Sequence, residues 1–219
     1  MAGFDKSVFL QPKRDLAWKI FFAFVAAALM GFGIALNTYV GLGNDAISVF
    51  ADGLHSFFKV DLGMAFNISN YTVFTIVLIF ARQYINIGTL INVLMLGSFV
   101  NVGLDLYTFF NIPDNFIFRA AVAVVACVLL FFGIAMFIAV NIGVDPWTGL
   151  AMFVSDKTHV QYKFCRIAFD VLSLIIGYLL GGTVGITTVV ASCFGGPIIQ
   201  AFANLIRTSL LSKFNFRDN

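Results

Sequence analysis

The chain has 219 residues, of which 60% are hydrophobic and only 11% are charged. Soluble domains usually carry about 25% charged residues, so too little polar surface is present to coat a water-soluble globule. The net charge is only +2, and the basic residues are concentrated at the two ends and in short loops, which argues against nucleic-acid binding. The composition predicts an all-α, polytopic membrane protein whose main surroundings are the lipid bilayer.

In chain order, six apolar segments are predicted to cross the membrane as helices. A spanning helix needs roughly 20 apolar residues, and long stretches of this chain carry no Lys or Arg. The apolar runs are continuous, which favours helices over the alternating pattern of a β-barrel. The predicted spans are residues 17–40, 66–81, 88–109, 118–141, 165–180 and 184–206.

Two shorter segments, residues 45–58 and 145–157, separate the first and second spans of each half. Each begins with an Asp and is too short to cross the bilayer comfortably. Both are predicted to be short helices that enter the membrane without crossing it.

The two halves of the chain carry similar motifs in the same order, which predicts an internal duplication. The first repeat is assigned to residues 1–112 and the second to residues 113–219, with the border in the polar turn at residues 111–115. Each repeat contains three spans and one short helix within one membrane domain. The matching pairs are Gly33-Ile-Ala-Leu36 with Gly133-Ile-Ala-Met136, Gly43-Asn-Asp45 with Gly143-Val-Asp145, Thr89 with Thr187, and Gly97 with Gly195.

The topology has two alternatives, because the charge distribution fits both. With six spans, 11 basic residues lie inside and 2 outside; with eight spans, the division is 12 to 1. Both place the two termini in the cytoplasm, and element length favours six spans. Six spans give inverted repeats, as in many secondary transporters, whereas eight give parallel repeats.

A ligand site is predicted around Asp145-Pro146-Trp147. Asp is a preferred N-cap and Pro is favoured at the first helical position, so a helix begins here with its N–H groups directed into the protein. Asp45 holds the equivalent place in the first half. The alternative is a capped helix with an interfacial Trp. The last span is predicted to kink or break at Gly195-Gly196-Pro197, because Pro removes a backbone donor.

Three polar residues fall within predicted spans, namely Asn92, Asp105 and Asp170. Such groups within a membrane usually face a cavity or a partner. Asp170 follows Arg166 by four residues, so an ion pair along one helix is the alternative interpretation. Asp105 lies near the end of its span. The complete predicted substrate-binding set is Asp45, Asn92, Asp105, Asp145, Trp147, Asp170, Gly195 and Gly196.

Sequence motifs of enzymes and of bound cofactors are absent from the chain. It contains no HExxH, GxSxG or P-loop sequence, and its two histidines lie in separate halves. No catalytic residue, cofactor or metal site is therefore expected.

The repeated motifs resemble those of bacterial YczE/YitT-type membrane proteins. The resemblance extends from about residue 20 to residue 206, and it implies a polytopic helical membrane fold, for which transport is a common suggestion. The first half lacks the Pro-Trp pair. The motifs are Gly33-Ile-Ala-Leu36, Leu42-Gly43, Gly88-Thr-Leu-Ile-Asn92 and Gly97 in the first half, and Gly133-Ile-Ala-Met136, Ile142-Gly143 and Asp145-Pro-Trp147 in the second.

The duplication, the predicted break and the polar residues within spans together favour a small-molecule transporter or membrane substrate-binding subunit. A small polar or aromatic metabolite is the expected substrate. The alternative is a membrane scaffold or regulatory protein without transport. The expected location is the bacterial cell membrane, and a homo-oligomer or a partner membrane protein is a further expectation.

Overall fold

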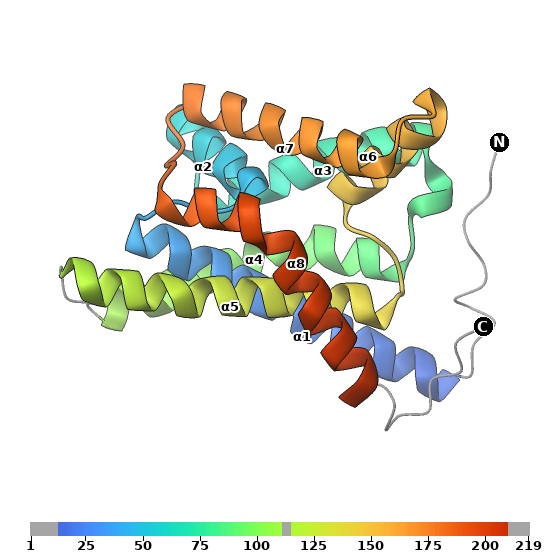
Figure 1. Ribbon diagram of the computed structural model, residues 1–219, viewed down its shortest axis with the longest axis horizontal. Coiled ribbons are helices and arrows are strands. Elements are labelled where there is room, and N and C mark those ends of the chain that lie inside the picture. Colours follow the sequence, from blue (N-terminus) through green and yellow to red (C-terminus); the bar gives the residue numbers. More distant parts are fainter. Residues whose placement is uncertain (1–12, 111–114, 210–219) are drawn as a thin grey trace.

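The computed structural model describes residues 13–110 and 115–209, and every regular element among them is a helix (Figure 1). The predicted border between the repeats, after residue 112, lies outside the described residues. The elements are α1 (Lys13–Val40), α2 (Ala46–Phe58), α3 (Leu62–Phe80), the 3-10 turn η2 (Arg82–Tyr84), α4 (Ile87–Phe110), α5 (Phe116–Val140), α6 (Pro146–Thr158), α7 (Tyr162–Leu179) and α8 (Ile186–Ser209).

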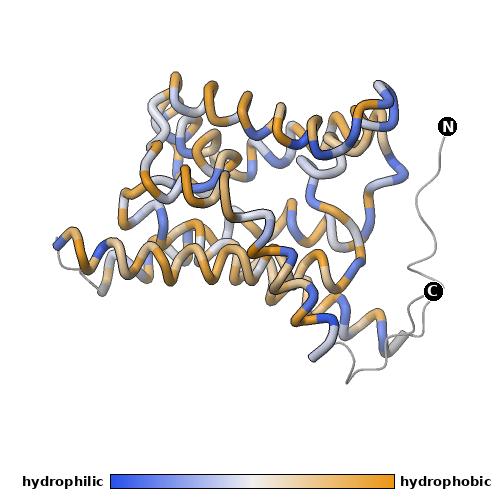
Figure 2. The backbone as a smooth tube through the Cα atoms, viewed as in Figure 1, coloured by the Kyte–Doolittle hydropathy of each residue, from blue (hydrophilic) through white to orange (hydrophobic). Residues whose placement is uncertain are grey.

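The predicted helices are confirmed in type, order and approximate bounds. Five of them, α1, α3, α4, α5 and α8, are long and apolar enough to cross a membrane. The sixth predicted span, α7, has 18 residues and includes Lys163, Arg166 and Asp170. Large apolar side chains remain exposed on the outer surface, with Phe109 86% and Ile117 77% accessible, as expected for contact with lipid. Figure 2 shows hydrophobic residues along most of the helix lengths.

The centre of the molecule is a close antiparallel pair formed by α1 and α5 (Figure 1). A Cβ added at Gly33 would lie 2.6 Å from the backbone nitrogen of Leu130, and one added at Gly133 would lie 2.8 Å from that of Met30. Helices in membranes often meet through such small residues, because these let the backbones approach. At the end of this pair, Arg119 Nε of α5 donates a 2.9 Å hydrogen bond to the carbonyl of Val40 in α1.

The direction of α4 decides between the two topologies that the sequence left open. Gly31 and Gly103 pack against Phe99 and Ala35 respectively, so residue numbers rise together along α1 and α4 and the two helices are parallel. In an eight-span arrangement α1 and α4 would run in opposite directions, and α1 and α5 in the same direction. Both observed directions disagree with eight spans and agree with six.

The two short helices, α2 and α6, lie toward opposite ends of the molecule (Figure 1). Each has 13 residues, about 20 Å of helix, which is shorter than the roughly 30 Å hydrocarbon core. Each ends at a residue with left-handed backbone, Lys59 with φ 53° and His159 with φ 56°. This supports the prediction that neither helix crosses the bilayer.

Each half is hydrogen-bonded to the start of a long helix of the other half. After α1, the carbonyl of Leu42 accepts from Thr187 N in α8; after α5, the carbonyl of Ile142 accepts from Gly88 N in α4, each at 3.0 Å. Thr188 Oγ1 accepts from Asn44 N at 3.1 Å. Thr89 Oγ1 accepts from Asn86 N and Thr188 Oγ1 from Gly185 N, each at 3.2 Å, so Thr188, one residue after the predicted Thr187, makes the contact that matches that of Thr89.

The last helix differs from the predicted break. α8 is one continuous helix with Pro197 inside it, and Figure 1 shows a change of direction about halfway along its length. The predicted kink agrees with that bend, but a broken helix does not. A Pro within a helix removes one backbone hydrogen bond, and the rest of the ladder continues on both sides.

Candidate functional site

The N-terminal parts of α2 and α6 approach each other between the two halves of the chain. The ring of Phe50 on α2 packs edge-to-face against the indole of Trp147 on α6, with 5.7 Å between ring centroids. Both helices begin just after a glycine with positive φ, Gly43 and Gly143, which lets the chain turn from a long helix into a short one. The positive ends of two helix dipoles therefore lie near each other.

Asp145 caps α6 as the sequence predicted. Its carboxylate accepts from the backbone N–H of Thr148 at 3.0 Å and from the Thr148 hydroxyl at 2.6 Å. Asp45 has the same place before α2 and accepts from the hydroxyl of Ser48, but it makes no backbone cap bond. Both short helices thus begin with an Asp whose carboxylate is held by a hydroxyl three residues later.

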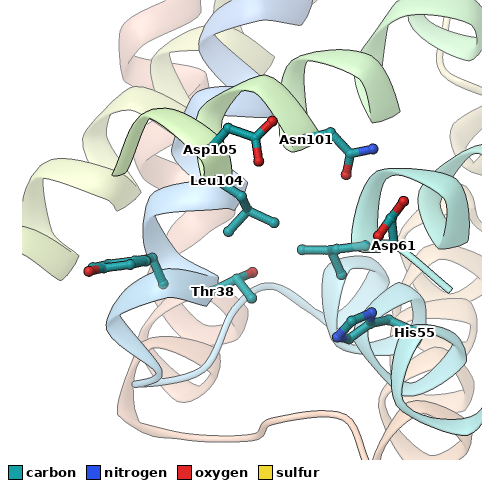
Figure 3. A pocket seen from close by; sticks show the side chains of 8 residues that line it. Thr38, His55, Asp61, Asn101, Leu104 and Asp105 are labelled. Carbon is teal, nitrogen blue, oxygen red and sulfur yellow. The ribbon is translucent and has the colours of Figure 1, made fainter. Parts of the chain in front are cut away.

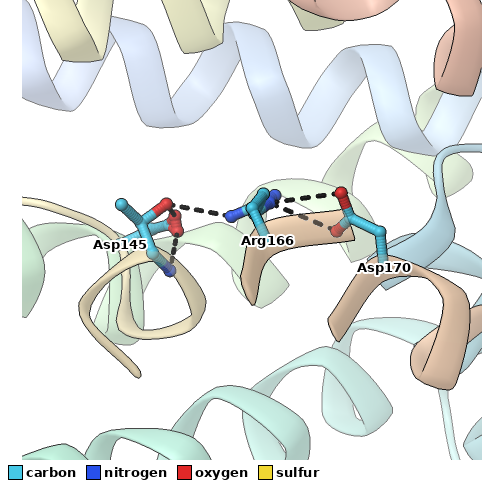
Figure 4. Close-up of polar contacts among 4 residues, drawn as sticks. Asp145, Arg166 and Asp170 are labelled. Atoms are coloured by element: carbon cyan, nitrogen blue, oxygen red, sulfur yellow. Dashed lines mark hydrogen bonds and ion pairs between the residues drawn. The ribbon is translucent and has the colours of Figure 1, made fainter. Parts of the chain in front are cut away.

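Arg166 on α7 connects this cap to Asp170 (Figure 4). Its guanidinium donates to Thr148 Oγ1 at 3.0 Å and forms an ion pair with Asp170 at 3.2 Å. The predicted ion pair along one helix is confirmed, but it forms part of a longer chain of polar contacts that reaches Asp145.

The Arg166 and Asp170 side chains remain 30% and 37% exposed, and Asp170 lies near the middle of α7. At that exposure an ion pair contributes little to stability. Charged groups at membrane depth almost always face the protein interior or a water-filled space. This face of α7 is therefore suited to a polar ligand rather than to lipid.

The charges at this place do not balance. Arg166 contacts Asp170 directly and reaches Asp145 through the Thr148 hydroxyl, and Asp45 lies within electrostatic range of the guanidinium, so three carboxylates lie near one positive charge. Each helix N-terminus is equivalent to roughly half a positive charge, so with all three carboxylates ionised the two helices still leave about one negative charge in excess. A positively charged group would neutralise that excess.

Trp147 adds an unused donor to the same place. Its indole N–H is buried and has no hydrogen-bond partner in the described part of the protein, although the ring packs among the apolar side chains of α3. Buried indole N–H groups usually find a partner. The site thus offers an aromatic face, one free donor and an excess of carboxylates.

The structure distributes the predicted substrate-binding residues over several places. It brings Asp45, Asp145, Trp147 and Asp170 together. Asn92 is 1% exposed on α4, and its amide nitrogen has no partner among the described residues. Gly195 packs against the ring of Phe131, and a Cβ added at Gly196 would meet nothing within 4 Å.

Asp105 lies apart from this group and lines a cavity of about 370 Å³ at the end of the molecule where α1 and α4 finish (Figure 3). The close-up shows Asp105 and Asn101 on α4 across the cavity from Asp61 and His55. The complete lining is Thr38, Tyr39, His55, Asp61, Leu62, Asn101, Leu104 and Asp105.

Thr148 and Phe50 are parts of the site that the sequence did not single out. The sequence did offer one signal for Thr148. A residue with a hydroxyl follows each repeated Asp by three positions, Ser48 after Asp45 and Thr148 after Asp145, which is the spacing of a helix cap. The contact between Phe50 and Trp147 joins residues of different halves, and no local pattern predicts it.

Comparisons with known proteins agree with this fold but assign no function. The chain is 24% identical to an uncharacterized protein of Haemophilus influenzae over 185 residues, covering 83% of this chain and 81% of that protein. It is 23% identical to the uncharacterized membrane protein YczE of Bacillus subtilis over 193 residues, 86% of each chain, and 20% identical to the uncharacterized protein YyaS of the same organism over 195 residues, 86% of this chain and 94% of that protein.

No solved structure matches the chain. The similarity to YczE confirms the resemblance on which the sequence analysis drew. Residues 17–204, nearly the whole of the helical region, match the family of unknown function DUF6198. This membrane protein therefore belongs to the DUF6198 family.

Proposed function

We propose that the protein transports a small molecule across the cell membrane, or binds it there, at the meeting point of α2 and α6. The observation that carries this proposal is the polar group there, in which Arg166 lies near Asp45, Asp145 and Asp170, beside the indole N–H of Trp147 that has no partner among the described residues. Groups of this kind are costly within a bilayer and usually mark substrate pathways.

The arrangement of the helices supports transport over a static binding site. Short helices whose N-termini point at a site between two inverted repeats are a recurring feature of secondary transporters. Here α1 and α5 are antiparallel, and α2 and α6 start near each other but extend toward opposite ends. Rocking one half against the other would open the site to each side in turn.

The chemistry of the site favours a small amphipathic cation. An excess of about one negative charge suits one ammonium group, and the rings of Phe50 and Trp147 provide an apolar and cation–π surface. An amine with one aromatic ring would use both features. A cationic aromatic amine is a narrower class of substrate than the small polar or aromatic metabolite that the sequence suggested.

The test uses purified full-length protein and two aromatic amines, phenethylamine and tryptamine, with benzoate as an acidic aromatic control. The amines are expected to raise the melting temperature in a saturable manner, because a ligand that binds only the folded state stabilises it. Benzoate should not. Proteoliposomes should then accumulate the labelled amine that stabilises more.

Failure of every amine to bind, together with stable co-purification of another membrane protein, would favour the scaffold or regulatory alternative. Binding without uptake would restrict the protein to a substrate-binding role. Movement of the labelled amine in either direction, following an imposed gradient and stopping when that gradient is dissipated, would support transport through the site.

A further inference from the structure

A second, much smaller cavity lies where α1 ends, between the loop at residues 41–45, α2 and the link to α8. Its volume is about 10 Å³, close to the minimum that holds one water molecule or one small ion. Five of its seven lining residues carry polar side chains. The residues are Asn37, Thr38, Gly41, Gly43, Asn44, Asp52 and Thr183.

Asn37 provides an oxygen that nothing in the described residues uses. The side chain is 1% exposed; its amide nitrogen makes a long 3.9 Å contact with Cys127 Sγ, and its Oδ1 is buried without a partner. Leaving a buried acceptor unsatisfied costs free energy. Asn44 beside it is held rigidly, because its amide donates to the carbonyl of Ile34 at 3.2 Å and to Thr38 Oγ1 at 3.3 Å.

Asp52 provides a carboxylate without a cation. It is 8% exposed, and one of its oxygens accepts from the backbone N–H of Thr183 at 2.7 Å. Among the described residues, no Lys, Arg or His forms an ion pair with it. Buried charges in proteins are normally paired or coordinate a metal ion.

We propose that this cavity binds one Na⁺ ion, with Asp52 and Asn37 as its principal ligands. A single carboxylate balances one positive charge, and the other polar side chains of the lining, those of Asn37, Thr38, Asn44 and Thr183, are neutral. Divalent ions usually take more carboxylates, and transition metals prefer His or Cys. The described residues contain no cluster of three or more His, Cys, Asp or Glu arranged for a metal.

The residues at the matching positions in the second half support a specific role for the polar cavity residues of the first half. At the same offset of 100 residues, Asn37, Thr38, Asn44 and Asp52 correspond to Phe137, Ile138, Val144 and Met152, all of them apolar. The polar set is therefore not a requirement of the fold, since the second half builds the corresponding turn without it.

The large cavity described above provides a polar approach to this site. Thr38 lines both cavities, and Asp61 and Asp105 line the larger one, where their charges would attract cations. On the inner side, Asn44 directly precedes Asp45 of the candidate ligand site. The ion site stands on its own geometry and does not depend on the proposed transport function.

The test measures the melting temperature of the purified full-length protein in NaCl, KCl and choline chloride at equal ionic strength. Na⁺ is expected to raise the melting temperature saturably above the other two salts, since only the folded state has the cavity. Equilibrium binding of ²²Na⁺ should give one saturable component. Equal melting temperatures in all three salts would mean that the cavity holds only water, and would overturn the proposal.

Two variants and one control assign the site. Asp52→Asn should weaken Na⁺ binding by about 30-fold or more because it removes the negative charge, and Asn37→Ala by about tenfold because it removes a ligand oxygen. Asp156→Asn makes the same chemical change on the other short helix, outside the cavity, and should keep the Na⁺ effect even if its baseline stability falls. Retention of full Na⁺ binding by both site variants would refute the assignment. If Asp52→Asn does not fold, Asn37→Ala alone decides.

Discussion

At the start of α6, Asp145 combines two roles that separate substitutions can distinguish. As an N-cap it satisfies a backbone N–H of the first turn, and as a charge it acts on Arg166. The first role needs only an acceptor oxygen, whereas the second needs the negative charge. Asp145→Asn keeps the first and removes the second.

Asp145→Asn is therefore expected to leave the melting temperature near that of the unmodified protein and to weaken amine binding by about 30- to 150-fold, the effect of one lost charge-assisted contact. Asp145→Ala should in addition destabilise the fold by about 1 kcal/mol, since Ala cannot cap. Thermal unfolding and amine titration measure the two effects separately. Unchanged amine binding by Asp145→Asn would show that Asp145 is only a cap.

Trp147→Phe tests the indole N–H without removing the aromatic surface. If no ligand uses this donor, its removal should leave stability unchanged or raise it slightly, because the N–H is buried and has no partner among the described residues. If a water molecule held by the bound amine accepts from the indole, Trp147→Phe should weaken binding by about five- to tenfold. Equal affinity in both proteins would exclude the indole N–H from the site.

Among the helices, length, order and caps could be predicted from the sequence, because they depend on local patterns. Asp45 and Asp145 mark the starts of α2 and α6 within one residue of the predicted segments. The behaviour of α8 could not be predicted as well, since Gly195-Gly196-Pro197 weakens a helix locally while packing against α5 retains it. The cluster around Arg166 was only half predicted: its pair with Asp170 is local, but its contact with Thr148 joins two helices.

The close contact between α1 and α5 leads to a prediction with a matched control. Gly33→Ala should destabilise the protein by roughly 1–3 kcal/mol, because its Cβ would lie 2.6 Å from a backbone nitrogen of α5 that cannot move independently. Gly196→Ala makes the same change in another helix, where a Cβ meets nothing within 4 Å, and should be neutral or slightly stabilising. Melting temperatures in one detergent compare the two. Equal effects would contradict the described packing of α1 on α5.

For the whole molecule, the relative directions of the helices are the information that the sequence lacked. Charge counts fit six and eight spans almost equally, because they register only which loops are basic. The structure distinguishes them through contacts between distant residues, such as Arg119 with Val40. Those contacts fix α1 and α5 as antiparallel but leave open which end faces the cytoplasm.

Cysteine labelling measures that orientation directly. In a background without Cys127, Cys165 and Cys193, single cysteines replace Gln83, in the turn between α3 and α4, and Asn115, before α5. With cytoplasmic termini, a membrane-impermeant thiol reagent should label position 115 in intact cells and position 83 only after permeabilisation. Loss of the Asn115 cap should cost about 1 kcal/mol, which a stable fold tolerates.

Each outcome of the labelling has a distinct structural meaning. The two positions lie at opposite ends of α4, so opposite accessibility is required if α4 crosses the membrane. Label on both positions in intact cells would contradict the assignment of α4 as a span. The reverse pattern, with position 83 outside, would mean that the whole protein is inserted the other way, because the parallel pair of α1 and α4 already disagrees with eight spans. The large cavity would then open to the cytoplasm, and the Na⁺ site would be filled from the inside.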